Sequence, residues 1–177
     1  MRESLKTGDF IVSSSTLSDF DQAILNSSQE KKKTYTHIGM IERKEKEIYV
    51  WHSSPLKGVC LERLDSFILS EEEKDFDIFR LIEKVDFYEI LAQLEKRRFS
   101  PYNFSFIKSN QAYYCSELLV EVFPKGIFKE KEMRFIGSFW SDYFEKLKME
   151  IPENERGSHP NDLMAQKNIQ YIGKLSK

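Results

Sequence analysis

The stretch QAYYCSELLVEVF, from Gln111 to Phe123, places a cysteine at the start of an apolar helix. Positions 115, 118, 119 and 122 are Cys, Leu, Leu and Val, the i, i+3, i+4, i+7 spacing of a buried helix face. We therefore expect Cys115 to point inward from the first helical turn. Because free cysteine is also a common small apolar core residue, a purely structural thiol is the alternative interpretation of this position.

The position of Cys115 also favours chemistry. A thiolate in the first turn faces backbone N–H groups that have no intrahelical acceptor and the positive end of the helix dipole. Together with a nearby cation, these features lower the pKa of a thiol and make it a nucleophile. Cys60 lies in a strand-like run, away from any helix start, and is expected only to fill the core. Two cysteines do not suggest a disulfide framework.

Segments on both sides of the cysteine helix alternate between strand and helix patterns. A turn at Gly8 and Asp9 is predicted to lead into a short strand, and further strands are predicted at 34–41, 47–52, 58–64 and 75–82. Helices are predicted at about 18–32, 86–99 and 138–148, besides the one from Cys115. Ser18 is a plausible cap of the first helix, and the lysine run 31–33 its solvated end. Residues 151–162 are predicted to form an ordered surface loop, and an α+β class follows.

Length and charge limit the possible functions. A chain of 177 residues is most simply one domain, here 1–177, with a core that needs no metal or disulfide. The 27 basic and 29 acidic residues give a net charge of -2 and no basic field, which argues against nucleic-acid partners. Because no apolar run is long enough to span a bilayer, we expect a soluble protein, cytoplasmic as given or exported if a leader has been removed.

Two of the three histidines, His37 and His52, lie in neighbouring strand-like runs. If residues 43–46 form a four-residue hairpin loop, paired residue numbers add to 89, and His37 stands opposite His52 on one face of the sheet. Tyr35, two residues before His37, is expected on the same face. The alternative is an exposed hairpin that carries histidines by chance, since a shift of one residue removes the pairing.

A cysteine at a helix N-terminus and a histidine on a neighbouring strand are the two halves of a thiol catalyst. The second histidine can hydrogen-bond to the first and fix its tautomer and orientation. The backbone N–H of Cys115 and the hydroxyl of Tyr35 are candidate donors to the developing oxyanion. His159, in the irregular tail, is expected to be an ordinary loop residue.

Several motifs, in this order along the chain, together resemble a known family. They are GDFIV, THIGMI, YVWHSS, GVCLERLDSF, PYNFSF, YYCSELL and the segment from FWSDYF to HPNDL. This series is similar to the landmarks of YiiX-like permuted papain-fold cysteine hydrolases, relatives of NlpC-type peptidases and of lecithin:retinol acyltransferase. The resemblance implies a circularly permuted papain-like fold, with an antiparallel sheet or half-barrel packed against helices.

The same resemblance implies roles for individual residues. His37 matches the base of the family, Cys115 its nucleophile and His52 its third polar residue, which gives a Cys-His-His triad. Tyr114 stands where non-permuted relatives have an aspartate that helps to bind a substrate amine. Asn103 occupies a position at which relatives often have Asp. Glu117 in the first helical turn could take over the amine contact, and the alternative is that it only interacts favourably with the helix dipole.

The implied function is that of a cysteine amidase or peptidase acting on a small peptide, a peptidoglycan fragment or an acyl conjugate, without a cofactor. Acyl transfer or thioester hydrolysis on lipid substrates is a related alternative. A zinc site formed by His37, His52 and Cys115 is a second class of function, since these side chains are three N and S ligands. A binding module without catalysis is a third.

Overall fold

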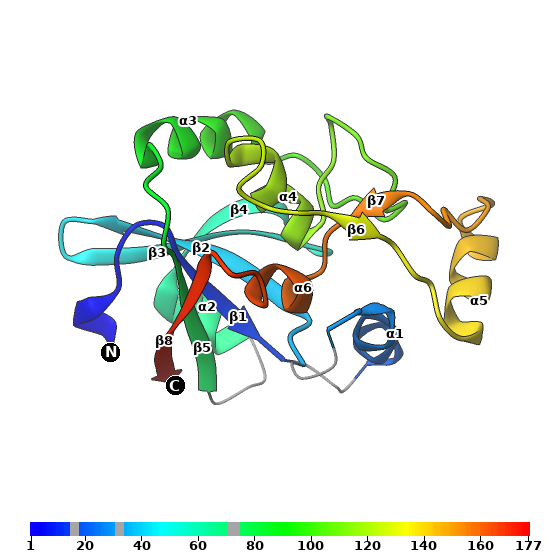
Figure 1. Cartoon of the computed structure of the whole chain (residues 1–177), viewed down its shortest axis with the longest axis horizontal. Coiled ribbons are helices and arrows are strands. Elements are labelled where there is room, and N and C mark those ends of the chain that lie inside the picture. The colour runs from blue at the N-terminus through cyan, green and yellow to red at the C-terminus, as the bar shows by residue number, and fades with distance from the viewer. Residues whose placement is uncertain (15–17, 31–33, 71–74) are drawn as a thin grey trace.

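Six antiparallel strands form one sheet, and helices pack against both of its faces (Figure 1). The structure, a computed structural model, describes residues 1–14, 18–30, 34–70 and 75–177. The helical elements are η1 (Arg2–Ser4), α1 (Asp19–Ser27), α2 (Leu64–Ser70), α3 (Phe87–Arg97), α4 (Cys115–Val122), α5 (Ser138–Lys146) and α6 (Pro160–Met164). The strands are β1 (Asp9–Ser13), β2 (His37–Lys44), β3 (Glu47–Ser54), β4 (Gly58–Arg63), β5 (Asp75–Leu81), β6 (Lys131–Glu132), β7 (Arg156–Gly157) and β8 (Ile169–Ser176). The predicted α+β class is confirmed.

The order of strands in the sheet is β4-β3-β2-β1-β5-β8, and β6 and β7 form a separate two-stranded ribbon. The sequence predicted the first five of these strands but neither β8 nor the ribbon. It also placed residues 151–162 in a loop, whereas this segment contains β7 and the start of α6. The pairing of β5 with β8 shifts register between Ile78 and Phe79, and such an interrupted strand has a weak alternation pattern.

The β2–β3 hairpin has a tighter turn than predicted. Met40 pairs with Trp51 and Lys44 with Glu47, so paired numbers add to 91 and the predicted register was wrong by two residues. Only residues 45 and 46 form the turn, in which Glu45 has a positive φ of 52°. Such turns usually contain Asn or Gly. This turn contains neither, so no local signal predicted it. A shift of two residues leaves each side chain on its predicted face.

Alternation along the strands divides the buried side chains between two faces. The face covered by α4 carries the α4-side cluster, which includes Phe10, Ile38, Met40, Trp51, Val59, Cys115, Leu118 and Leu119. The opposite face is covered by α2 and carries the α2-side cluster, which includes Ile11, Ile41, Val50, Leu64, Phe67, Ile68 and Phe76. The expected inward face of the cysteine helix is confirmed, since positions 115, 118, 119 and 122 are all buried.

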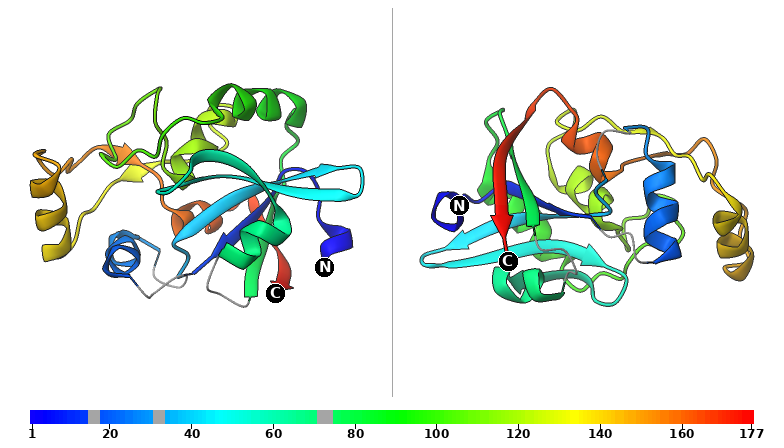
Figure 2. Two further views of the ribbon diagram at one scale, coloured as in Figure 1. Left: turned by 180° about the vertical axis from the view of Figure 1, so that it is seen from behind. Right: turned by 90° about the horizontal axis from the view of Figure 1, so that it is seen from below.

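Two outer helices, α1 and α5, pack together at one end of the sheet (Figure 2). Ser18 caps α1 as predicted, accepting a hydrogen bond from the N–H of Asp21. The helix ends at Ser27, short of the predicted end, and the lysine run 31–33 lies outside the described residues. Trp140 of α5 is buried against α1 and donates a hydrogen bond from Nε1 to Ser27.

Candidate active site

The two predicted histidines meet on the sheet. Nε2 of His37 lies 2.9 Å from Nδ1 of His52, within hydrogen-bonding distance. His37 is the first residue of β2, and the observed register places it diagonally rather than directly across from His52. Both rings contact Phe67 of α2, which stacks on His37 and meets His52 edge-on. The α2-side cluster therefore holds the pair in a largely apolar environment.

Burial changes the pKa of His37. Desolvation, with the neighbouring His52 as a smaller cause, lowers the pKa of His37 to about 3. His37 is therefore neutral near neutral pH, and in this buried position its imidazole is a weak base. Because Nε2 of His37 is directed to His52, its Nδ1 is the nitrogen left for proton transfer.

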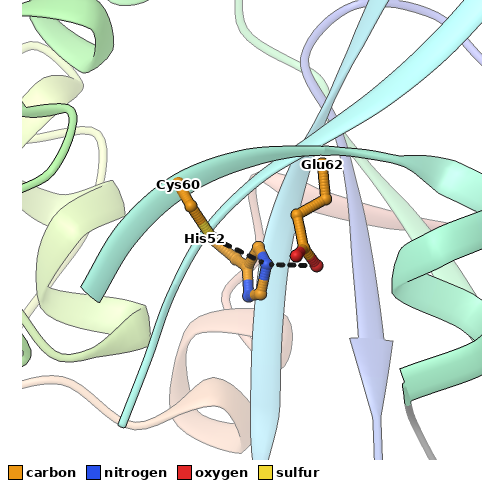
Figure 3. A group of neighbouring side chains, drawn as sticks. All are labelled: His52, Cys60 and Glu62. Atoms are coloured by element: carbon orange, nitrogen blue, oxygen red, sulfur yellow. Dashed lines mark hydrogen bonds and ion pairs between the residues drawn. The ribbon is translucent and has the colours of Figure 1, made fainter. Parts of the chain in front are cut away.

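Strand β4 adds two further groups to the imidazole pair (Figure 3). Cys60 pairs with His52 across the β3–β4 hairpin, and its Sγ lies 3.2 Å from Nε2 of His52. Oε2 of Glu62 lies 3.2 Å from the same nitrogen, and Lys57 contacts the other oxygen of this carboxylate. The expectation that Cys60 only fills the core is therefore wrong, since its thiol is half-buried among polar groups.

The surroundings shift the pKa values of Glu62 and Cys60 in opposite directions. The hydrogen bond from His52 is the main cause that lowers the pKa of Glu62, to about 2. Desolvation raises the pKa of Cys60 to about 11, and the nearby Glu62 carboxylate adds to this effect. Near neutral pH Cys60 is thus a protonated thiol beside a carboxylate, which is a poor state for a nucleophile.

Cys115 is the first residue of α4 and lines a pocket that opens to solvent. Residues of α1, α5 and the β6–β7 ribbon also line it, together with 157–160 of the tail and Thr36 just before β2. Aromatic side chains form much of the wall, namely those of Tyr102, Phe106, Tyr114, Phe135 and Trp140. The cysteine at the helix N-terminus therefore lines a largely aromatic pocket.

The structure does not bring this thiol to the imidazoles. Cys115 belongs to the α4-side cluster, whereas His37 and His52 contact Phe67 in the α2-side cluster. The hydrogen bonds of the two rings run to each other, to Glu62 and to Cys60. The only histidine lining the Cys115 pocket is His159, within the described parts of the chain. Its Nδ1 accepts from the N–H of Asn161 and its Nε2 donates to the carbonyl of Ile24, which agrees with a structural role.

Tyr35 lies away from the place expected for an oxyanion donor. Its hydroxyl donates to the carboxylate of Asp77 on β5, and its ring packs edge-on against Phe79 at 5.8 Å. It was expected to share a face with His37. Because Tyr35 precedes the first residue of β2, strand alternation does not apply to it.

The other predicted binding residues lie around the N-terminus of α4. Tyr114 lines the pocket, and its hydroxyl accepts a hydrogen bond of 3.1 Å from the N–H of Ser158. Asn103 and Glu117 are buried and bond to each other at 3.0 Å, and neither is among the residues that line the pocket. Burial raises the pKa of Glu117 to about 7. Of these three side chains, only that of Tyr114 is placed to meet a ligand in the pocket.

Comparison with known proteins identifies the family. The family model of the permuted papain-like amidase enzyme, YaeF/YiiX, C92 family, matches residues 4–173. The chain belongs to this family of amidases. The crystal structure of the metalloprotein YiiX from Escherichia coli O157:H7 is similar with a TM-score of 0.80 and 20% identity, over 97% of this chain and 98% of that one. At this identity the likeness shows the shared fold, and no curated protein matches the chain.

The C92 amidase thus has the permuted papain-like fold that the sequence predicted. Its β4 residues Cys60 and Glu62 were missed as site residues. A signal was present, because the three residues 55–57 make a short β3–β4 loop that places Cys60 opposite His52. Among the described residues, the cluster with metal-ligand character is His52, Cys60 and Glu62, not the predicted set with His37 and Cys115. No helix in the described segments is long and apolar enough to cross a bilayer.

Proposed function

We propose that this C92 amidase cleaves an amide bond through an acyl-thioester on Cys115. The thiolate attacks the carbonyl carbon, the C–N bond breaks, and the leaving amine takes the proton from His37. Water then attacks the thioester while His37 accepts its proton. Hydrolysis releases the carboxylic acid and restores the thiol. In this scheme His37 and Cys115 are the catalytic residues and His52 is a positioning residue.

The observation that carries this proposal is the place of Cys115 in an amidase-family fold. Its sulfur stands at the N-terminus of α4 and lines the aromatic pocket. Backbone N–H groups of a first helical turn can donate to an oxyanion formed beside that sulfur. Since the hydroxyl of Tyr35 bonds to Asp77, these N–H groups are the better candidates.

The base role of His37 requires a movement. Thr36 lines the Cys115 pocket, and α4 packs against β2 and β3, so the backbone of His37 lies beside the pocket. Its ring must turn from Phe67 toward the thiol for proton transfer from Sγ to Nδ1. Catalytic hydrogen bonds often form only when substrate is bound, and this one also requires His37 to give up its contacts with Phe67 and His52.

The pocket favours a substrate with an apolar or aromatic acyl part, which suits a small peptide, a cell-wall fragment or an acyl conjugate. The same lining supports acyl transfer or thioester hydrolysis as the alternative activity. Assays with γ-glutamyl amides and with acyl esters, each with and without an acceptor amine, separate the two. A binding domain without catalysis would form no acyl adduct with any of these substrates.

Cys60 is the second candidate nucleophile, because its sulfur is already 3.2 Å from Nε2 of His52. Two observations weigh against it. Its pKa is raised to about 11, and it lies in a strand rather than at a helix N-terminus. A neighbouring carboxylate disfavours both its ionisation and the negative charge of an oxyanion.

Labelling by iodoacetamide near neutral pH tests the assignment. We expect Cys115→Ser to lower the labelling rate of the folded protein by roughly tenfold or more, because a helix N-terminus favours the reactive thiolate form of a cysteine. Cys60→Ser is the matched control and should retain the label, and circular dichroism verifies the fold of both variants. Equal labelling of wild type and Cys115→Ser, or loss of label only in Cys60→Ser, would overturn the role of Cys115.

A further inference from the structure

We propose that His52, Cys60 and Glu62 bind a divalent zinc ion on the α2-covered face of the sheet. One ligand atom from each residue lies within 4.8 Å of the other two. All three residues come from the β3–β4 hairpin, whose register aligns Cys60 with His52 and places Glu62 two residues farther on the same face (Figure 3). This site is separate from the pocket of Cys115 and does not depend on the proposed amidase chemistry.

The distances suit a tetrahedral ion. Nε2 of His52 lies 3.2 Å from Sγ of Cys60 and 3.2 Å from Oε2 of Glu62. Zinc–ligand bonds of roughly 2.0 to 2.3 Å place neighbouring ligand atoms about 3.3 to 3.6 Å apart in a tetrahedron. Small side-chain movements would therefore complete three corners and leave the fourth for water or another ligand.

Hydrogen bonds alone do not satisfy the nitrogen, the sulfur and the carboxylate of this cluster at the same time. One proton on Nε2 can serve either the sulfur or the carboxylate, although both lie at the same distance. If the thiol instead donates to Nε2, the lone pairs of the carboxylate face an atom that offers no proton. A cation satisfies all three atoms at once, and the thiol proton is then released to solvent.

Neighbouring residues already support the ligands as an outer shell. His37 lies 2.9 Å from Nδ1 of His52, the arrangement that fixes the tautomer and direction of a metal-binding imidazole. Phe67 packs against the same ring at 5.0 Å between centroids. Lys57 contacts the second oxygen of Glu62, where it orients the carboxylate and competes with a cation by its charge.

The donor types select the metal. One imidazole nitrogen, one thiolate sulfur and one carboxylate oxygen form a mixed N, S and O set that suits zinc. Magnesium and calcium prefer sites built from oxygen alone. Cys60 and Glu62 are half-buried, so a solvated ion can reach their side chains.

Zinc at this site would inhibit the proposed catalysis. This consequence, unlike the site itself, rests on the proposed function. With the ion on Nε2, His52 carries its proton on Nδ1 and donates it to Nε2 of His37. The proton of neutral His37 must then sit on Nδ1, the nitrogen needed to accept a proton from Cys115. Zinc should therefore slow the labelling of Cys115, and Cys60→Ala should remove this inhibition.

Titration of the metal-free full chain with cobalt(II), a spectroscopic substitute for zinc, tests the site directly. We expect one equivalent to bind with a thiolate-to-cobalt charge-transfer band and the visible absorption of tetrahedral cobalt. Cys60→Ala should abolish the charge-transfer band. Glu62→Gln should weaken zinc binding roughly tenfold or more, and Lys57→Met should strengthen it by removing a competing cation.

Cys115→Ala is the matched control and should retain the band, because its thiol is not a ligand. Thermal unfolding of each metal-free variant verifies the fold. The proposal is overturned if wild type binds no cobalt, if the band survives in Cys60→Ala, or if it disappears in Cys115→Ala. Failure of the amidase proposal would instead appear as unchanged iodoacetamide labelling in Cys115→Ser, so the two outcomes can be told apart.

Discussion

Replacement of Glu117 by glutamine tests the energetic cost of a buried carboxyl behind the cysteine helix. Glu117 is 1% exposed, and its Oε2 accepts hydrogen bonds from Asn103 and from the N–H of Tyr114. Within the described residues, its Oε1 has no hydrogen-bond partner. Glutamine keeps the shape of the side chain and an oxygen for both donors, so the substitution removes chiefly the ability to ionise.

The expected change in the free energy of unfolding follows from the pKa of Glu117. Burial raises the pKa of Glu117 from 4.5 to about 7, so between these values the folded state binds more protons than the unfolded state. Stability from this group is complete below the lower pKa and falls as pH rises through the higher one, by about 3 kcal/mol in all. The lowered pKa of His37 acts in the opposite direction but is common to both proteins.

Urea unfolding at about pH 5 and about pH 8 measures the effect. The free energy of unfolding of Glu117→Gln, relative to wild type, should increase by about 2.5 kcal/mol between these pH values. Glu145→Gln, which changes an exposed carboxyl on α5, is the control for removing one charge. An increase below about 1 kcal/mol for Glu117→Gln, or an equal increase in the control, would refute the reasoning.

Two further substitutions test the packing of the sheet. Asp9→Ala should lower the free energy of unfolding by about 3 kcal/mol, because it leaves the guanidinium of Arg80 without its buried carboxylate. Asp65→Ala breaks an exposed ion pair and should lower the free energy of unfolding by less than about 1 kcal/mol. Similar losses in urea titrations of the two variants would contradict the role of burial. Gly58→Ala should cost about 1 to 3 kcal/mol more than Gly126→Ala, since both glycines have positive φ but only a Cβ at Gly58 would meet a backbone oxygen, at 2.2 Å. Equal melting temperatures of the two alanine variants would rule out that clash.

Long periodic elements could be predicted from the sequence. The cysteine helix was recognised because its buried face follows one helical stripe, and α1 because Ser18 caps it. Helix α2 was missed although Leu64, Phe67 and Ile68 follow helical spacing, because seven residues directly after a strand also fit the end of that strand. Strand β8 was missed because half of its residues are exposed, only Leu175 is buried and Gly173 interrupts it.

The candidate site was predictable only in part. Contact between His37 and His52 followed from hairpin geometry, and an error of two residues in register did not remove it. Which face of the sheet α4 covers depends on long-range packing, and local periodicity does not report it. For this reason the thiol of Cys115 was expected at the imidazoles, whereas in the structure Cys60 occupies that place.

The outermost strand of the sheet has a consequence for how the protein folds. β8 pairs with β5 along its length, but helices α3 to α6 separate these strands in the sequence. Such distant pairing closes a long loop and slows folding. Until β8 arrives, one edge of β5 has unpaired backbone groups on which another chain can add a strand. The charged residues Asp77 and Arg80 of β5 disfavour that association while the edge is open.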